Sequence, residues 1–329
     1  MDFKHIGKSI EDFMSTVDGR RKGTIRSLRT SLNKLNKHTM NGIPWNRIIT
    51  LAGRSGSGKS LFLEQLKRDF CDLNKDQKFD VLSFEFEMLS TDQVARNVSG
   101  NLDVSTKHLY SADQNTITDA EYDHIGKVAD KLKYYPIYYV DESGTPDEIY
   151  QTVMRFAEYR KLKENNKGLV VTIDHALLCR GKQGESEKSV IDSLCKTMIR
   201  LKKKFDAAGM KIIIIMVSQL NRDIESPDRV MNPKLHYPGR SDIFGSSAIF
   251  FASDYVFVIH KPASMEGLVA LNSGYGPSGY PLNNKENPDQ AHIYLHILKE
   301  RFGSNAILLL LDNFKRSRID EYFAPKKAA

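Results

Sequence analysis

The chain has 329 residues, of which 40% are hydrophobic and 27% charged, and 48 Lys and Arg against 41 Asp and Glu give a net charge of +7. These values are typical of a globular protein with one large core, and they exclude a chain too polar to fold. The mild positive charge is compatible with a polyanionic partner. The three cysteines have no spacing typical of a metal site or a disulfide framework.

The chain shows no sign of a targeting or membrane-spanning segment. Its first eight residues form no apolar signal region. The longest aliphatic run, Ile212–Val217, is far too short to cross a bilayer. We therefore expect a cytoplasmic protein, in a cell or in the cytoplasm of an infected host cell, with no membrane partner.

The first predicted element is an amphipathic helix over residues 4–17. Its apolar residues Ile6, Ile10, Phe13 and Met14 recur at helical spacing, and the sequence 19–23 then interrupts the pattern. A short amphipathic helix outside the core must dock on its own domain or on a neighbouring subunit.

A complete phosphate-binding motif follows at Gly53–Ser60, which matches the P-loop pattern G-x-x-x-x-G-K-[ST] between a predicted strand and a predicted helix. Backbone N–H groups of such a loop surround a phosphate, and the helix N-terminus favours negative charge. Lys59 would reach the β- and γ-phosphates, and the Ser60 hydroxyl would bind Mg²⁺. We expect ATP and Mg²⁺ as cofactors, with the nucleotide held by Gly53, Ser55, Gly56, Ser57, Gly58, Lys59, Ser60 and Leu61.

Strand and helix patterns then alternate along the chain. The runs 169–173 and 212–217 are apolar without alternation, which is typical of strands buried on both faces of a parallel sheet. Pro146 and Glu148 after Thr145 predict a capped helix start. The predicted strands are 47–52, 79–86, 136–140, 168–173, 211–217, 254–259, 292–298 and 305–311, and the predicted helices are 59–72, 90–98, 118–133, one opening at 145, and 186–208. Three long segments, 180–189, 221–239 and 264–289, are predicted as loops.

Polar residues at predicted strand ends are candidates for catalysis. Asp174 ends an apolar strand and is the candidate Mg²⁺-binding acid. Hydrolysis also needs a group that orients water, and Glu85 and Glu87 share one face of an extended strand, so spacing does not choose between them. Gln219 ends a third strand, where it could hydrogen-bond a γ-phosphate.

These motifs together resemble the C-terminal ATPase domain of DnaB-type hexameric replicative helicases, which has a RecA-like P-loop NTPase fold. The resemblance covers most of the chain. Besides the P-loop, it is carried by Glu11–Lys22, Phe84–Met88, Tyr135–Tyr150, Asp174–Leu178, Ser218–Arg222, Asp242–His260 and Lys299–Gly303.

The resemblance implies a mostly parallel sheet flanked by helices over residues 25–329, preceded by a linker helix at 1–24 that docks on another subunit. It assigns the catalytic role to Glu87 and phosphate sensing to Gln219. It also implies that Lys299 and Arg301 act on ATP held by the adjacent subunit of a homo-oligomeric, hexameric ring. The implied partners are single-stranded DNA and either a primase or a helicase loader. The family's N-terminal collar domain has no counterpart in this sequence.

Residues for DNA contact are expected in the segments 180–189 and 221–247, which would hold the phosphate backbone. The candidates are Arg180, Lys182, Arg222, Arg240, Gly245 and Ser246. Where the family commonly has an Arg-Glu pair, this chain has Phe244–Gly245.

Three functions are therefore considered. The first is an ATP-driven helicase that translocates on single-stranded DNA and unwinds duplex during replication. The second is a RecA-like recombination or repair ATPase that forms filaments, and the third is a helicase-derived regulatory ATPase that does not unwind DNA.

Overall fold

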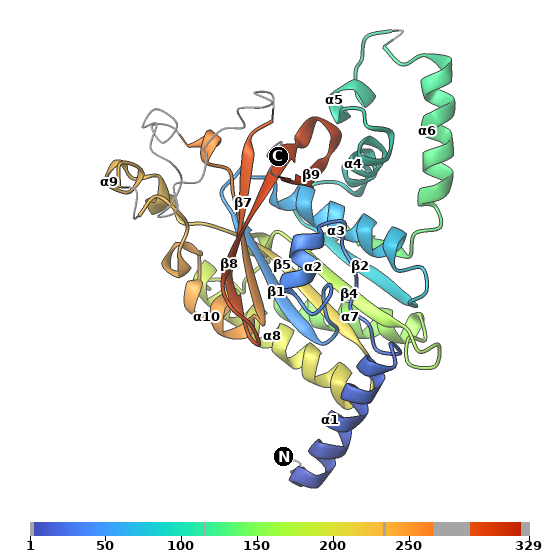
Figure 1. The fold of residues 1–329 in the computed structure, drawn as a ribbon, viewed down its shortest axis with the longest axis vertical. Coiled ribbons are helices and arrows are strands. Elements are labelled where there is room, and N and C mark those ends of the chain that lie inside the picture. The colour runs from blue at the N-terminus through green and yellow to red at the C-terminus, as the bar shows by residue number, and fades with distance from the viewer. Residues whose placement is uncertain (1–2, 115, 233–234, 266–289, 324–329) are drawn as a thin grey trace, which may run out of the picture.

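The computed structural model describes residues 3–114, 116–232, 235–265 and 290–323, and within them one nine-stranded sheet forms the centre of the molecule (Figure 1). The strand order is β3-β2-β4-β5-β1-β6-β7-β8-β9. The strands are β1 (Arg47–Gly53), β2 (Phe79–Glu85), β3 (Ile137–Val140), β4 (Gly168–Asp174), β5 (Ile212–Gln219), β6 (Tyr255–His260), β7 (His292–Glu300), β8 (Ala306–Asn313) and β9 (Arg318–Glu321). The helices are α1 (Ile6–Arg21), α2 (Asn33–His38), α3 (Lys59–Leu73), α4 (Ser90–Leu102), α5 (Thr106–Leu109), α6 (Asp119–Leu132), α7 (Pro146–Tyr159), α8 (Glu187–Ala207), α9 (Pro227–Val230) and α10 (Ser246–Ala252).

The strands from β3 to β6 in this order pair in parallel, and β7, β8 and β9 extend the sheet in antiparallel fashion. The predicted mostly parallel α/β fold is confirmed. The antiparallel pairing of β7 with β8 and of β8 with β9 follows from short connections, because a tight turn between consecutive strands cannot return the chain to a parallel partner. The carboxyl ends of β1, β2, β4 and β5 share one edge of the sheet, here called the carboxyl edge.

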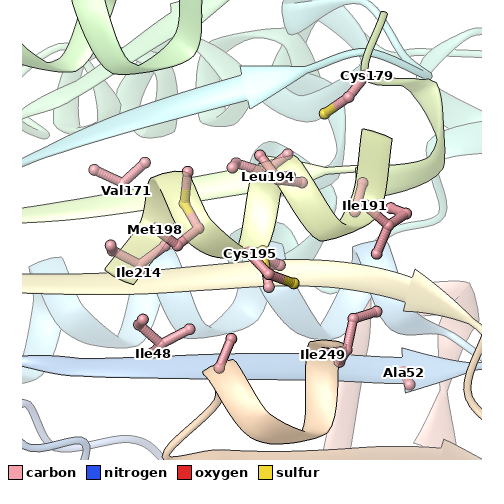
Figure 2. Close-up of a cluster of buried hydrophobic side chains, with 14 of the residues drawn as sticks. Ile48, Ala52, Val171, Cys179, Ile191, Leu194, Cys195, Met198, Ile214 and Ile249 are labelled. Carbon is pink, nitrogen blue, oxygen red and sulfur yellow. The ribbon is translucent and has the colours of Figure 1, made fainter. Parts of the chain in front are cut away.

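Helices cover both faces of the sheet, and each face has its own apolar core. On one face, α8 and α10 pack on β1, β4 and β5, where Leu194 and Met198 of α8 lie among Ile48, Val171 and Ile214 (Figure 2). On the other face, Phe62 and Leu66 of α3 pack against a second set of strand residues. Because these strands are buried on both sides, their sequences are apolar without alternation.

Local signals place the helix starts. The Thr145 hydroxyl accepts the N–H of Glu148, and the Glu148 carboxylate accepts the N–H of Thr145, so the predicted capping box at α7 is confirmed. The same reciprocal pair opens α6 at Thr118 and Glu121. Such caps stabilise a helix by satisfying N–H groups that have no partner within it.

Helix α1 projects from one end of the molecule (Figure 1). It contains no buried residue, and Ile6, Ile10 and Phe13 are 69%, 53% and 63% exposed. The helix continues through Gly19 to Arg21, slightly beyond the predicted end. In the described residues, no helix is both long and apolar enough to cross a membrane.

Two of the three predicted loops contain helical structure. Helix α8 begins at Glu187, after the cap residue Ser186, so the helix predicted over 186–208 is confirmed and the end of the overlapping predicted loop 180–189 is helical. The segment 221–239 contains a 3₁₀ turn at Arg222–Glu225 and the short helix α9. Residues 266–289 of the third predicted loop lie outside the described residues.

Candidate nucleotide-binding site

The P-loop connects the end of β1 to the start of α3, as the motif requires. Gly58 caps α3 with φ of +95°, and a Cβ at this position would lie 2.5 Å from the Phe314 ring, so both the left-handed backbone and the close ring require glycine. The Ser57 hydroxyl donates to the Arg54 carbonyl over 2.8 Å and closes the loop on itself. The result is a compact glycine-containing turn at the N-terminus of a fifteen-residue helix, where an anion is favoured.

The Lys59 ammonium lies inside this turn. Its Nζ donates to the Arg54 carbonyl oxygen over 2.7 Å, and the residue is 7% exposed. Burial lowers the pKa of Lys59 to about 8, although the Asp174 and Glu87 carboxylates oppose the shift. A buried ammonium with a lowered pKa favours an anionic ligand, because a nearby negative charge would stabilise its protonated form.

Asp174 ends β4 and is 2% exposed. Burial raises the pKa of Asp174 to about 6, while its contact with Ser60 lowers it. Within the described residues, Asp174 Oδ1 is buried and accepts no hydrogen bond. Mg²⁺ prefers oxygen ligands and is often bound by a carboxylate together with nucleotide phosphates. The Ser60 hydroxyl and the unpaired Asp174 oxygen therefore fit this ion.

Glu85 and Glu87 have different surroundings. Strand β2 ends at Glu85, which is 2% exposed and forms an ion pair of 2.9 Å with Lys67. Glu87 follows the strand, is exposed, and acts electrostatically on both Lys59 and Asp174. Of the two glutamates, Glu87 therefore has the carboxylate that water and a ligand can reach.

Gln219 lies beside the P-loop, because it pairs with Gly53 across β5 and β1. Its carbonyl oxygen accepts the N–H of Phe244 over 3.0 Å. Arg54 of the P-loop also forms an ion pair with Glu225 in the segment that follows β5. The P-loop therefore contacts the segment 221–247 directly at Glu225, and through its neighbour Gln219 it is linked to Phe244.

Lys299 and Arg301 lie at the end of β7, on the edge of the sheet opposite the carboxyl edge. Glu300 pairs with Tyr255, which pairs with Ile49, and Ile49 precedes Gly53 by four residues or about 13 Å of strand. Arg301 Nε lies 2.6 Å from Asp254 Oδ1, and the Arg301 side chain is 45% exposed. Lys299 Nζ donates to the Phe250 carbonyl oxygen. These two cations are therefore separated from the P-loop of their own chain.

The candidate DNA-contact residues occupy four places. Arg180 and Lys182 are exposed near the start of α8, and Arg180 forms an ion pair of 3.2 Å with Glu148. Arg222 is exposed in the 3₁₀ turn after β5. Arg240 is exposed and lies 4.5 Å from the centre of the Phe250 ring.

Gly245 and Ser246 stand at the start of α10. A Cβ at Gly245, where φ is +68°, would lie 2.9 Å from Ile191 of α8, so glycine allows α10 to approach α8 closely. The hydrogen bonds and ion pairs of Arg180 and Lys182 among the described residues go to Gly144, Glu148 and Glu185 and not to Gly245.

Two residues of the site were missed by sequence reasoning. Phe314 covers the P-loop at Gly58, and Asp254 holds Arg301. Asp254 also accepts the Ile48 N–H over 2.9 Å and Lys202 Nζ over 2.8 Å. An isolated acid before an apolar strand was the only available signal for Asp254, and a lone phenylalanine offers none.

Comparison with known families matches residues 27–318 to the DnaB-like helicase C-terminal domain. A curated protein of Guillardia theta, "Probable replicative DNA helicase", is 24% identical over 188 residues, which are 57% of this chain and 29% of that protein. This chain thus matches less than a third of that relative's length.

Two solved structures share the fold. One, described as an ATPase domain, has a TM-score of 0.75 and 16% identity, and the match covers 98% of this chain and all of the other. The second, described as a DnaB-like replicative helicase and its interactions with primase, has a TM-score of 0.72 and 15% identity over 98% of this chain and 68% of the other.

Proposed function

This chain belongs to the family of DnaB-like helicase C-terminal domains, and on that premise we propose that it is an ATP-driven motor that translocates on single-stranded DNA and unwinds duplex. The observation that carries the proposal is the convergence of the P-loop, Asp174, Glu87 and Gln219 at the carboxyl edge. These groups have the positions that binding and hydrolysis of a nucleoside triphosphate require.

In the proposed mechanism, the P-loop N–H groups and Lys59 would hold the phosphates, and Ser60 and Asp174 would hold Mg²⁺. The ion bound with ATP would neutralise charge that develops on the phosphoryl oxygens. Glu87 orients the attacking water and accepts its proton, because its carboxylate is exposed and close to both Lys59 and Asp174. Gln219 donates to the γ-phosphate and transmits its loss through the Phe244 N–H.

We assign Arg301 and Lys299 to the nucleotide of a second copy. Their separation from the P-loop of their own chain supports this assignment, since an arginine acts on a phosphoryl group only by direct contact. Asp254 fixes Nε of Arg301 and leaves the side chain 45% exposed, so the guanidinium is presented outward. Hydrolysis would then require assembly, and a closed ring of six copies is the arrangement that the family implies.

Helix α1 is proposed to dock on a neighbouring copy through Ile6, Ile10 and Phe13, whose exposed side chains form one apolar stripe. Substituting serine at Ile10 and Phe13 should shift light scattering toward smaller species. Serine at Lys8 and Glu11, which form an ion pair of 3.3 Å on the polar side, is the matched control. Equal behaviour of the two variants would contradict the docking role.

DNA contact is assigned to the segment 221–247 together with Arg180 and Lys182. The link from Gln219 to Phe244 supports this, because it joins the proposed γ-phosphate sensor to the residues before α10. Arg222, Arg240, Gly245 and Ser246 would hold DNA phosphates without reading bases. A primase or a loader is a further proposed partner, since the solved relative is described with primase.

The decisive experiment measures ATP hydrolysis with and without single-stranded DNA, together with unwinding of a forked duplex. Stimulation by DNA with unwinding is the expected result. Hydrolysis without stimulation or unwinding would instead support a regulatory ATPase. This alternative is considered because Phe244 stands where the family commonly has a charged residue. Open filaments in electron micrographs would favour a recombination ATPase.

A further inference from the structure

A buried cluster of charges joins the P-loop helix to the strand that precedes Glu87. Lys67 of α3 is fully buried, and its ammonium lies between the carboxylates of Glu64, on the same helix, and Glu85, at the end of β2. Burial opposes the charge on Lys67, but Glu64 and Glu85 outweigh burial and raise its pKa. Burial raises the pKa of Glu64 to about 7, although Lys67 opposes this shift.

Such a cluster is a costly way to fill a core. Removing an ammonium and two carboxylates from water costs several kcal/mol per ion, and well-packed apolar side chains often serve stability equally well. The nucleotide mechanism does not use Lys67, Glu64 or Glu85. The cluster therefore calls for an explanation beyond stability.

Glu85 makes contacts to three different elements. Its Oε1 accepts Lys67 Nζ of α3, and its Oε2 accepts Gln93 Nε2 of α4 over 2.8 Å. Ser83 of β2 donates to the same Oε1 and also bonds the Thr172 hydroxyl of β4, two residues before Asp174. Glu85 itself pairs with Asp174 across β2 and β4.

These contacts lie on both sides of Glu87 along the chain. The chain leaves β2 at Glu85, passes Glu87, and enters α4, whose first turns return Gln93 to the Glu85 carboxylate. Both ends of the short segment 86–89 are therefore fixed on one carboxylate. Lys67 ties that carboxylate to the helix that begins at the P-loop.

We propose that Glu85 is a positioning residue that, through Lys67 and Gln93, sets the place of Glu87 relative to the P-loop. This inference rests on the proposed catalytic role of Glu87. A carboxylate displaced by about 1 Å from its water can lose about 100-fold in rate, so rigid support of this segment has a catalytic consequence.

The test compares Glu85→Gln with Asp80→Asn. Asp80 is a matched control, because it is a fully buried carboxylate on the same strand, paired with Arg160 at 2.9 Å and Lys167 at 3.2 Å, but at the edge away from the P-loop. Both variants are expected to lower the melting temperature. Only Glu85→Gln should lower kcat, by about 10- to 100-fold, with KM for ATP unchanged within about twofold.

A double-variant experiment separates positioning from general damage. If Glu85 acts through Glu87, then Glu85→Gln should slow a Glu87→Gln protein no further, since the group it positions is already absent. An additive loss would overturn the proposal. So would normal turnover by Glu85→Gln, or an equal loss of kcat in Asp80→Asn.

Gln93→Met provides a milder variant that keeps every buried charge paired, and it carries the test if Glu85→Gln does not fold. It is expected to lower kcat several-fold with unchanged KM, and wild-type kcat would overturn the proposal. Activity retained by Glu87→Gln would instead refute the catalytic assignment to Glu87. The two failures are thus distinguishable.

Discussion

Buried ionisable groups have opposite pKa shifts at the two edges of the central sheet: the charged form is disfavoured at one edge and favoured at the other. At the carboxyl edge, burial lowers the pKa of Lys59 to about 8 and raises that of Asp174 to about 6, so the charged form of each group is disfavoured. At the other edge, burial opposes ionisation of Asp254, but Lys202, the Ile48 N–H and Arg301 lower its pKa below the usual value.

The two edges therefore differ in kind. The carboxyl edge would be stabilised by a bound ligand, whereas the other edge carries Arg301 as a partly exposed cation. The carboxyl edge has electrostatic needs that phosphates and a metal ion would meet. At the edge with Asp254 the buried charge is paired within the chain, and Arg301 is bound to Asp254 while its side chain stays 45% exposed. The following predictions test this contrast, beginning with the largest expected effect.

Lys59→Ala should lower ATP turnover by at least about 10³-fold, because it removes the cation that neutralises the phosphates. Steady-state hydrolysis with purified protein measures the effect, and the melting temperature without nucleotide checks the fold. Turnover near the wild-type rate would mean that the carboxyl edge is not the nucleotide site.

Arg301→Ala should lower turnover by at least about 100-fold while nucleotide affinity is retained, since the guanidinium acts only on the transition state. Mixing Arg301→Ala with Lys59→Ala should restore part of the activity, because an intact P-loop of one variant can meet an intact Arg301 of the other.

The control for this mixing experiment combines Lys59→Ala with Glu87→Gln. Both defects lie at the carboxyl edge, so no complete site can form and no activity should return. If Arg301→Ala and Lys59→Ala fail to complement each other in assembled mixtures, the two edges do not share one site.

Glu87→Gln should lower kcat by about 100-fold with little change in nucleotide binding, because the amide cannot accept a proton from water. Fluorescent-nucleotide titration and steady-state kinetics separate the two quantities. Retained activity would transfer the role to Glu85, in spite of its burial.

Asp174→Asn should stabilise the protein in the absence of Mg²⁺ and nucleotide. The folded pKa of Asp174 is raised from 3.8 to about 6, so its ionised form is penalised above that pH and the penalty vanishes below the unfolded value. The free energy of unfolding should therefore rise by about 1–3 kcal/mol near pH 7.5. Denaturant titration near pH 7.5 and near pH 4 measures it, and a gain that persists in acid would contradict this cause.

Much of the site could be predicted because its signals are local. The P-loop is a continuous motif, and Asp174 and Gln219 each follow an apolar strand, so parallel strands carry them to one edge. The sequence could not tell which of Glu85 and Glu87 is exposed. Alternation of faces applies only within a strand, and β2 ends at Glu85. The Glu85 carboxylate is held by Lys67 and Gln93, which lie 18 and 8 residues away in the two neighbouring helices α3 and α4, so its burial depends on how these helices pack.

The sequence by itself determined the class of fold, the P-loop and the family, since apolar periodicity and a contiguous motif need only near neighbours in the chain. Only the tertiary structure decided which charges are buried, which are exposed, and which edge each occupies. Arg301 shows the reason most clearly. Its distance from the P-loop follows from the antiparallel pairing of β7 with β6, and its partner Asp254 is 47 residues away along the chain. Electrostatic surroundings are set by long-range packing, and no local pattern encodes them.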